Sequence, residues 1–302
     1  TLAAASDATG RAIDEDKGVM TDEGVRIWTQ EIAFLVKRDI DRSASYDANG
    51  FGLAAGVEAP STDFGTLGLM TSFVNVNVDD SFAAAAETLG GQVFSAGVYW
   101  RDSVGGLTAN LGLTGGYASL KSTRVVSDPA AGLNRSARSN WNGGTFAAHG
   151  GLSYLLGAGR FFAKPQVSAD YFLLKEDGRT ENGGGDAVNL RIDKRSSDQL
   201  SAFAGVTFGA RFGEESAFVW IPELTAGWRQ AAGDGAGVTT ASFVAGGPAF
   251  SLEAPDLSGG GPVVRLGLRG QGKYFDFAVE GGGEFRDDYE AYDGRVIVRF
   301  LF

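Results

Sequence analysis

Hydrophobic and polar residues alternate one by one along most of the chain after Val25. A clear case is LSAFAGVTFGARF, from Leu200 to Phe212, in which one parity holds only Leu, Ala, Val and Phe. The other parity of this segment holds Ser, Gly, Thr and Arg beside one Phe. Side chains two positions apart lie on the same face of a strand, so the pattern predicts β-strands with one apolar and one polar face.

The alternation defines about twelve such segments. In chain order they are Val25–Lys37, Asn49–Glu58, Gly65–Asn77, Gln92–Arg101, Gly106–Lys121, Trp141–Gly157, Phe161–Lys175, Asp198–Phe212, Ala217–Ala231, Pro262–Gly272, Lys273–Arg286 and Tyr292–Phe302. Several are longer than the ~5–6 residues usual in soluble sheets. An even number of strands closes a barrel with both chain ends on one side. We therefore expect an all-β fold, a twelve-stranded antiparallel transmembrane β-barrel.

The connections between these segments alternate between short and long. The short ones are turn-like, for example APSTD, DSVG and GQGK. The long ones are STRVVSDPAAGLNRSARSN, EDGRTENGGGDAVNLRIDKRSS and AGDGAGVTTASFVAGGPAFSLEAPDLSGGG. Short turns at one end and long loops at the other are typical of an outer-membrane barrel. A soluble β-sandwich also has strands of period two, but it gives no reason to sort the loops by length.

The first residues of the chain, TLAAASDATGRAIDEDKG, do not alternate. They are rich in Ala and end at Gly18, a residue that often follows the last turn of a helix. We expect a short α-helix over Thr1–Lys17. It is kept slim by its small side chains, among them Ala3, Ala4, Ala5 and Ala8.

A slim helix of this kind fits inside the lumen of the barrel. Its cations, Arg11 and Lys17, would then pair with acidic residues of the barrel wall, where reduced solvent strengthens such pairs. The candidate acids are Asp276, Glu280 and Glu284. The expected division of the chain is a linker with a pore-plugging α-helix at 1–24 and an outer-membrane β-barrel at 25–302.

The polar faces of the last four segments carry charges that can pair across strands. An acidic segment lies between two basic ones, and opposite charges on neighbouring strands contribute about 0.2–1 kcal/mol each. In chain order these residues are Glu223, Arg229, Arg265, Arg269, Asp276, Glu280, Glu284, Arg295 and Arg299. If the first strand closes onto the last, Glu31 would face Arg295 or Arg299. The alternative is that these charges are solvated and unpaired.

Composition narrows the possible functions. The 302 residues carry a formal net charge of −11, which argues against nucleic acid as a partner. Cysteine is absent and His149 is the single histidine, so disulfides, thiolate metal sites and multi-histidine zinc sites are excluded. No apolar run approaches the ~18–20 residues of a membrane-spanning helix. We expect no cofactor, no metal site and no catalytic residues.

A hydrolase site in the barrel would depend on His149. Lipid-facing hydrolases of the outer membrane use His–x–Ser, but Gly150 and Gly151 follow His149 here. Ser153 lies roughly 13 Å along the strand, too far for a hydrogen bond. Asp170 is the one acid of lumen parity on the next strand, which is a weak basis for a protease site. A polar lumen residue is the simpler interpretation of His149.

The second half of the chain carries a characteristic order of strand and loop residues. A strand with Pro165 and then Tyr171 is followed by a loop with Glu181 and Gly183, and then by a strand with Gly205 that ends on the aromatic Phe212. Further along are Pro222 and Trp228 in PELTAGWRQ, the segment FVAGGPAF, and Phe302. This order resembles the autotransporter translocator domain.

This resemblance implies a twelve-stranded barrel with an α-helix in its pore, in the outer membrane of a Gram-negative bacterium. It implies that the barrel anchors and exports an upstream passenger. One subgroup cuts its own linker at an Asn–Asn pair, but this chain has no Asn before Asn49. The alternative function is a porin-like channel, which usually lacks an Ala-rich segment such as Thr1–Lys17; a barrel hydrolase is a more distant alternative.

The resemblance also assigns a role to GRVIVRFLF at the end of the sequence. Apolar residues at alternate positions before a final aromatic residue form the signal read by the barrel-assembly machinery, and they are Val296, Val298, Phe300 and Phe302. Outer-membrane lipid and lipopolysaccharide are further expected partners. We expect the barrel to be a monomer.

Overall fold

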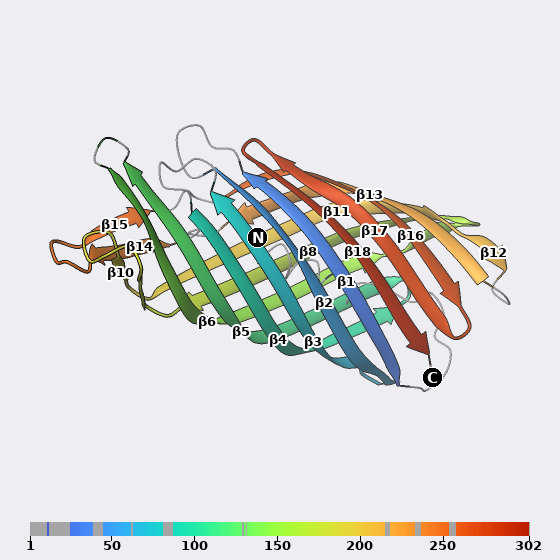
Figure 1. Ribbon diagram of the computed structural model, residues 1–302. Helices are drawn as coiled ribbons and strands as arrows, with labels where there is room; N and C mark the ends of the chain where they lie inside the picture. The colour runs from blue at the N-terminus through green and yellow to red at the C-terminus, as the bar shows by residue number, and fades with distance from the viewer. Residues whose placement is uncertain are drawn as a thin grey trace.

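Twelve long strands of the computed structural model form one closed antiparallel barrel (Figure 1). The structure describes residues 11, 25–38, 45–61, 63–80, 87–128, 130, 132–214, 218–232, 237–253 and 258–301. The barrel strands are β1 (Arg26–Arg38), β2 (Tyr46–Ser61), β3 (Gly65–Asp80), β4 (Glu87–Val104), β5 (Leu107–Asp128), β6 (Leu133–Tyr154), β8 (Phe161–Glu176), β11 (Arg195–Ala210), β13 (Phe218–Ala232), β16 (Gly259–Gly272), β17 (Phe275–Arg286) and β18 (Tyr289–Leu301). The predicted barrel is confirmed.

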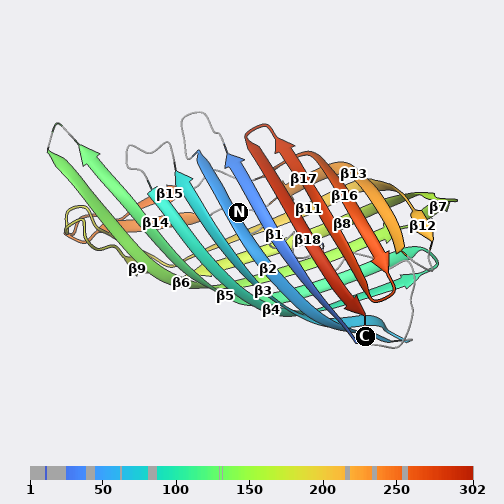
Figure 2. The same ribbon diagram turned by 45° about the vertical axis from the view of Figure 1, so that its right-hand side comes forward.

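The first and last strands close the barrel. β1 pairs with β18 along its whole length, from Arg26 opposite Leu301 to Arg38 opposite Tyr289, and the two lie side by side in Figure 2. Because Arg26 and Leu301 are partners, both ends of the barrel lie at one rim. The connections at this rim are tight, as at Gly105, whose φ of 59° favours glycine.

The long connections at the opposite rim contain strands that the alternation did not predict. β9 (Arg179–Thr180), β10 (Leu190–Ile192), β14 (Val238–Phe243) and β15 (Phe250–Glu253) form a separate four-stranded sheet. The predicted loop between the fifth and sixth segments is largely strand, because β5 and β6 each run for 22 residues. These parts lie beyond the lipid and need no apolar face, so alternating apolar residues do not reveal them in the sequence. β7 (Leu156–Ala158) and β12 (Phe212–Glu214) are short additions at the other rim.

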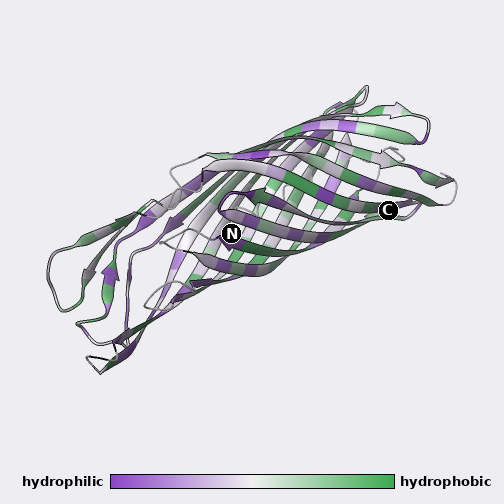
Figure 3. Cartoon of the chain, turned by 90° about the horizontal axis from the view of Figure 1, so that it is seen from above, coloured by the Kyte–Doolittle hydropathy of each residue, from purple (hydrophilic) through white to green (hydrophobic). Residues whose placement is uncertain are grey.

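Hydrophilic and hydrophobic residues alternate along the barrel strands in Figure 3, and buried and exposed side chains alternate with them. On β11, Thr207 is buried and Phe208 is 54% exposed. On β18, Val296, Val298 and Phe300 lie on the outward parity, whereas Arg295 and Arg299 are buried. The strands therefore present apolar residues to the lipid and polar residues to the lumen.

Exposed aromatic residues mark two levels on the outer face. One level lies near the rim that holds both barrel ends and includes Tyr154, Phe161, Trp220, Phe275 and Phe300. The other lies nearer the opposite rim and includes Phe51, Phe94, Tyr117, Phe146, Trp228, Phe285 and Tyr292. Aromatic girdles at the two membrane interfaces are a feature of transmembrane barrels. The strand segments between the two levels are called the apolar band below.

All described secondary structure is β-strand, and no helix in this part of the chain has the length and apolarity needed to cross a membrane. The helix predicted over Thr1–Lys17 lies outside the described residues, except for Arg11. Phe302 also lies outside them, as do Ala3, Ala4, Ala5, Ala8 and Lys17.

Candidate functional site

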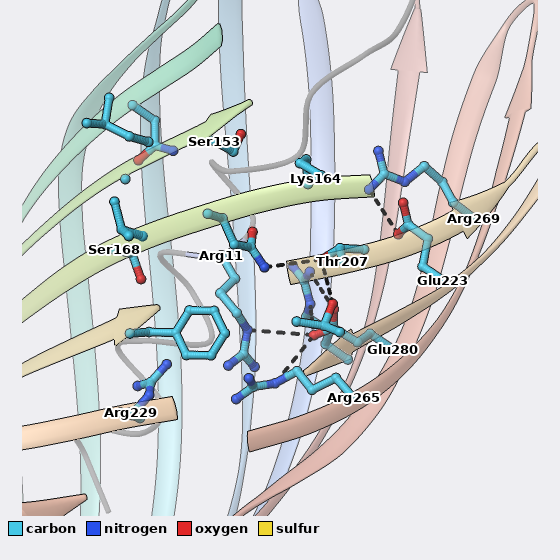
Figure 4. Close-up of a pocket in the computed structure, with 18 residues that line it drawn as sticks. Arg11, Ser153, Lys164, Ser168, Thr207, Glu223, Arg229, Arg265, Arg269 and Glu280 are labelled. Carbon is cyan, nitrogen blue, oxygen red and sulfur yellow. Dashed lines mark hydrogen bonds and ion pairs between the residues drawn. The ribbon is translucent and has the colours of Figure 1, made fainter. Parts of the chain in front are cut away.

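Charged side chains of β13, β16, β17 and β18 converge on the lumen. They surround a cavity of about 70 Å³, and Figure 4 shows Arg11, Arg265 and Glu280 pointing toward one another at its wall. The cavity also reaches β8 and β11, where Gln166 Nε2 donates a 3.1 Å hydrogen bond to Thr207 Oγ1. Arg265, Glu280, Gln166 and Thr207 lie on the inward parity of their strands, which makes this part of the lining polar.

Glu280 on β17 is the centre of the largest group of ion pairs in this wall. Its Oε1 lies 3.1 Å from Arg295 Nε on β18 and 3.9 Å from Arg265 Nε on β16. The register explains both contacts. Arg295 is the partner of Glu280 on β18, and Arg265 lies two residues before Gly267, which is the partner of Glu280 on β16. Asp293 on β18 also accepts a 3.3 Å hydrogen bond from Arg265 Nη2. The acidic strand thus lies between two basic ones, as the sequence indicated.

Arg11 joins this group from outside the barrel strands. Its Nε lies 3.7 Å from Glu280 Oε1, and its Nη2 forms an ion pair with Asp293. The Arg11 side chain is only 11% exposed. Glu280 was among the acids expected to bind Arg11, whereas Asp293 was not. We call Arg11, Arg265, Glu280, Asp293 and Arg295 the Glu280 cluster.

The other predicted charges of this wall form smaller groups. Glu223 lies 3.3 Å from Arg269, and Glu284 lies 3.6 Å from Arg229. Asp276 lies opposite Arg299 in the register of β17 and β18. Opposite charges therefore face each other over several strands, which favours one register of the pairing.

Arg299 makes its ion pair with a residue that the sequence analysis missed. Glu58 on β2 is fully buried, and its Oε1 lies 2.9 Å from Arg101, 3.7 Å from Arg299 and 3.8 Å from Arg26. Tyr99 donates a 2.8 Å hydrogen bond to Glu58 and accepts one from Trp28 Nε1. We call Arg26, Glu58, Tyr99, Arg101 and Arg299 the Glu58 cluster. Glu58 shares a parity with Gly52, Ala54 and Gly56, and this parity could have revealed its inward direction.

The prediction that Glu31 faces Arg295 or Arg299 is wrong. Glu31 is exposed on the outer face of β1, and its register partners are Val296 and Leu53. β1 has large apolar residues on both parities, including Phe34 inside and Leu35 outside. Hydrophobicity therefore could not fix its orientation, and the buried positions of Arg26 and Gln30 show the true inward parity.

The small sheet is held to the barrel mouth by two buried glutamates. Glu181 forms an ion pair with Arg124 of β5 and accepts a 2.9 Å hydrogen bond from the Leu190 amide. Glu176 accepts a 2.9 Å hydrogen bond from Trp141 Nε1. Arg179 lies over the Trp141 ring, 3.7 Å from its centroid. Burial lowers the pKa of the Arg179 guanidinium, and the neighbouring Glu176 opposes this shift.

His149 forms a pair that does not match a catalytic triad. Its Nδ1 lies 2.5 Å from Asp170 Oδ1 on the next strand, and Ser201 is the register partner of Asp170 on its other side. In a triad the histidine lies between the acid and the nucleophile, whereas here the acid lies in the middle. Within the described ranges no three metal-ligating side chains come together.

Comparison with known proteins places this barrel in a family. The family model described as Autotransporter beta-domain matches residues 27–279. An extracellular serine protease of Serratia marcescens is 22% identical over 229 residues, which are 76% of this chain and 21% of that protein. The chain thus spans about a fifth of the length of this relative.

Solved translocator domains share the fold. The translocator domain of the autotransporter NalP from Neisseria meningitidis superposes with a TM-score of 0.70 at 16% identity, covering 100% of this chain and 97% of that one. The transport unit of AIDA-I from Escherichia coli gives 0.66 at 16% identity, covering 99% of both chains. The beta domain of the Bordetella autotransporter BrkA gives 0.64 at 15%, covering 92% of this chain and 100% of that one. The chain belongs to the autotransporter beta-domain family, the translocator barrels of the outer membrane of Gram-negative bacteria.

Proposed function

We propose that this barrel anchors an autotransporter in the outer membrane and exports an upstream passenger through its own lumen. The observation that carries the proposal is the position of Arg11. This residue precedes β1 in the chain, yet its side chain is bound to the lumen wall by Glu280 and Asp293. A passenger joined upstream of Arg11 is therefore connected through the lumen.

The position of the barrel ends supports the same route. β1 begins at Arg26 and β18 ends at Leu301, and these two residues are register partners at one rim. In outer-membrane barrels the short turns and both ends lie on the periplasmic side. A segment that enters β1 there and also reaches the Glu280 cluster runs inside the barrel, toward the rim that carries the small sheet.

We infer that residues 1–24 form a linker with a pore-plugging α-helix and that 25–302 form the barrel. Small side chains such as Ala3, Ala4, Ala5 and Ala8 would keep the helix slim enough for the lumen. The contacts of Arg11 would hold it there, and Lys17 offers a second cation. The barrel itself would have no enzymatic activity, no metal and no cofactor. We infer that the barrel functions as a monomer.

We also infer two kinds of partner besides the passenger. The outward apolar parity of Val296, Val298 and Phe300 is the surface that the barrel-assembly machinery would read, together with Phe302. The apolar band would contact outer-membrane lipid, and the rim with the small sheet would contact lipopolysaccharide.

A porin-like channel is the second candidate, because rows of arginine and glutamate on a lumen wall also suit a wetted pore. Planar-bilayer conductance distinguishes the two. The whole chain should conduct weakly, and removal of the residues before Asp22 should raise the conductance. Unchanged conductance after this truncation, in a barrel that still folds, would favour the porin-like channel and contradict the plug.

A further inference from the structure

Among the described residues, the outer face of the barrel carries a single charge within its apolar band. Among the outward residues that the structure describes in this band, Glu31 on β1 is the one Asp, Glu, Lys or Arg. Every other outward position there is apolar, aromatic, glycine or threonine. An ionisable residue inside a membrane is rare and in most cases has a function.

The register of β1 with β18 gives the depth of Glu31 in the membrane. Ile27 lies opposite Phe300, and Leu35 lies opposite Tyr292. These two aromatic residues belong to the two girdles. Glu31 lies opposite Val296, midway between them. The Glu31 side chain therefore projects from the outer face of the barrel near the middle of the bilayer.

None of the described barrel residues supplies a cation to this carboxylate. No hydrogen bond or ion pair joins Glu31 to another described residue, and its register partners are Val296 and Leu53. The next outward cation on β1 is Lys37, which lies opposite Glu290 beyond the Tyr292 girdle. At ~3.3 Å per residue Lys37 is roughly 20 Å from Glu31 along the strand, which is beyond the reach of both side chains.

Two other sources of a cation are also excluded by geometry. The hydrocarbon core of a bilayer is about 30 Å thick, so the ammonium group of a lipid at the interface remains roughly 15 Å from the midplane. A second copy of this chain has no outward Lys or Arg among the described residues of its own apolar band. A carboxyl group at this depth is either protonated or paired with a cation, and a pairing cation would come from another protein that crosses the membrane.

We propose that the wall around Glu31 is a lateral docking surface for a transmembrane segment of another outer-membrane protein that presents a Lys or Arg at mid-bilayer depth. The surface consists of Glu31, its register partners Leu53 and Val296, and the smaller Thr29, Ala33, Ala55 and Gly294 next to them on β1, β2 and β18. Thr29, Ala33, Ala55 and Gly294 are small, so a neighbouring segment can approach closely beside Leu53 and Val296. Charge pairing at Glu31 then gives the contact its specificity.

A defined probe tests the surface in lipid vesicles. The probe is a labelled leucine-rich transmembrane peptide with one central Lys, compared with the same peptide carrying Gln at that position. Energy transfer to the labelled barrel should show that the Lys peptide binds about 5–30-fold tighter than the Gln peptide. Glu31→Gln should abolish this preference. The matched control is Glu290→Gln, which removes an exposed carboxylate outside the apolar band and should preserve it.

Equal binding of the two peptides to the folded wild-type barrel would overturn the proposal. So would a Lys preference that survives in Glu31→Gln. Both variants should run as folded barrels on unheated gels, so a loss of binding cannot come from misfolding.

Cross-linking in cells tests the partner itself. A photo-reactive residue at Ala33 should capture a protein with a Lys or Arg at mid-depth, and Val264 on the outer face of β16 is the control position. Exchanging the charges, with Glu31→Lys and the partner's cation changed to Glu, should restore a cross-link that either change alone removes. Capture of lipid alone, or of a protein without such a cation, would overturn the proposal.

Discussion

Arg11 and Asp293 lie 282 positions apart in the chain and form an ion pair inside the barrel. The same carboxylate also accepts a hydrogen bond from Arg265 on β16. One acidic residue of the last strand thus connects the segment before the barrel to the charged wall. The ion pair of Arg11 with Asp293 is the basis for proposing that the upstream segment lies inside the lumen.

Asp293→Asn should loosen the upstream segment. It removes the charge that binds Arg11 and Arg265 in a largely buried setting, where a hydrogen bond to a charged group is worth about 1.5–3 kcal/mol. We expect a loss of this size in the free energy of unfolding in lipid, together with more frequent channel openings in planar bilayers. Asp63→Asn, at an exposed turn, is the control and should change neither.

Glu58→Gln should destabilise the barrel more strongly than Asp293→Asn. It leaves Arg26, Arg101 and Arg299 around a neutral residue, and breaking a buried ion pair costs about 3–5 kcal/mol. Tyr99→Phe removes a single hydrogen bond to Glu58 and should cost about 0.5–1.5 kcal/mol. Urea unfolding of both variants in the same lipid gives the comparison. Equal costs would show that the charges of the Glu58 cluster are not what stabilises it.

Gly56→Ala should act through the ring of Trp28. A Cβ at Gly56 would overlap this ring, so the ring must move and its hydrogen bond to Tyr99 must weaken. Overpacking of this kind costs about 1–3 kcal/mol. Gly115→Ala is the matched control, because a Cβ at Gly115 meets nothing within 4 Å. Thermal unfolding of both variants measures the difference, and equal melting temperatures would contradict the packing.

Single cysteines should report the two faces of β11. The chain has no native cysteine, so each label is unique. A fluorophore at Phe208 should be quenched by a quencher in the lipid phase, whereas one at Thr207 should not. Equal quenching at both positions would show that the register of β11 is wrong.

The sequence predicted the barrel well because its strongest signal is physical. Lipid requires an apolar outer face, and strands such as Leu200 to Phe212 therefore alternate cleanly. The signal fails on β1, where Phe34 and Leu35 make both faces apolar and the orientation of Glu31 was misread. It also fails beyond the lipid, where nothing forces β10 or β14 to alternate.

The charges of the lumen wall were only partly predictable. Glu280 and Arg295 lie on adjacent strands of one hairpin, so their pairing follows from local register. The Glu58 cluster joins strands from both ends of the chain, because Arg299 lies on β18 and Glu58 on β2. Such a contact requires the closed barrel, and the sequence alone does not give the number of residues by which each strand is staggered.

A cross-link beside Arg11 tests the lumen position of the upstream segment most directly. Ala12→Cys, which leaves the ion pair of Arg11 and Asp293 in place, is combined with Ala291→Cys on the inward face of β18, or with Val296→Cys on its outward face. A short bis-maleimide is applied to the folded protein in membranes, and the cross-link is detected as a shift in gel mobility. We expect a cross-link between positions 12 and 291 and none between 12 and 296. A cross-link to 296 alone, or to neither position, would contradict an upstream segment held inside the lumen.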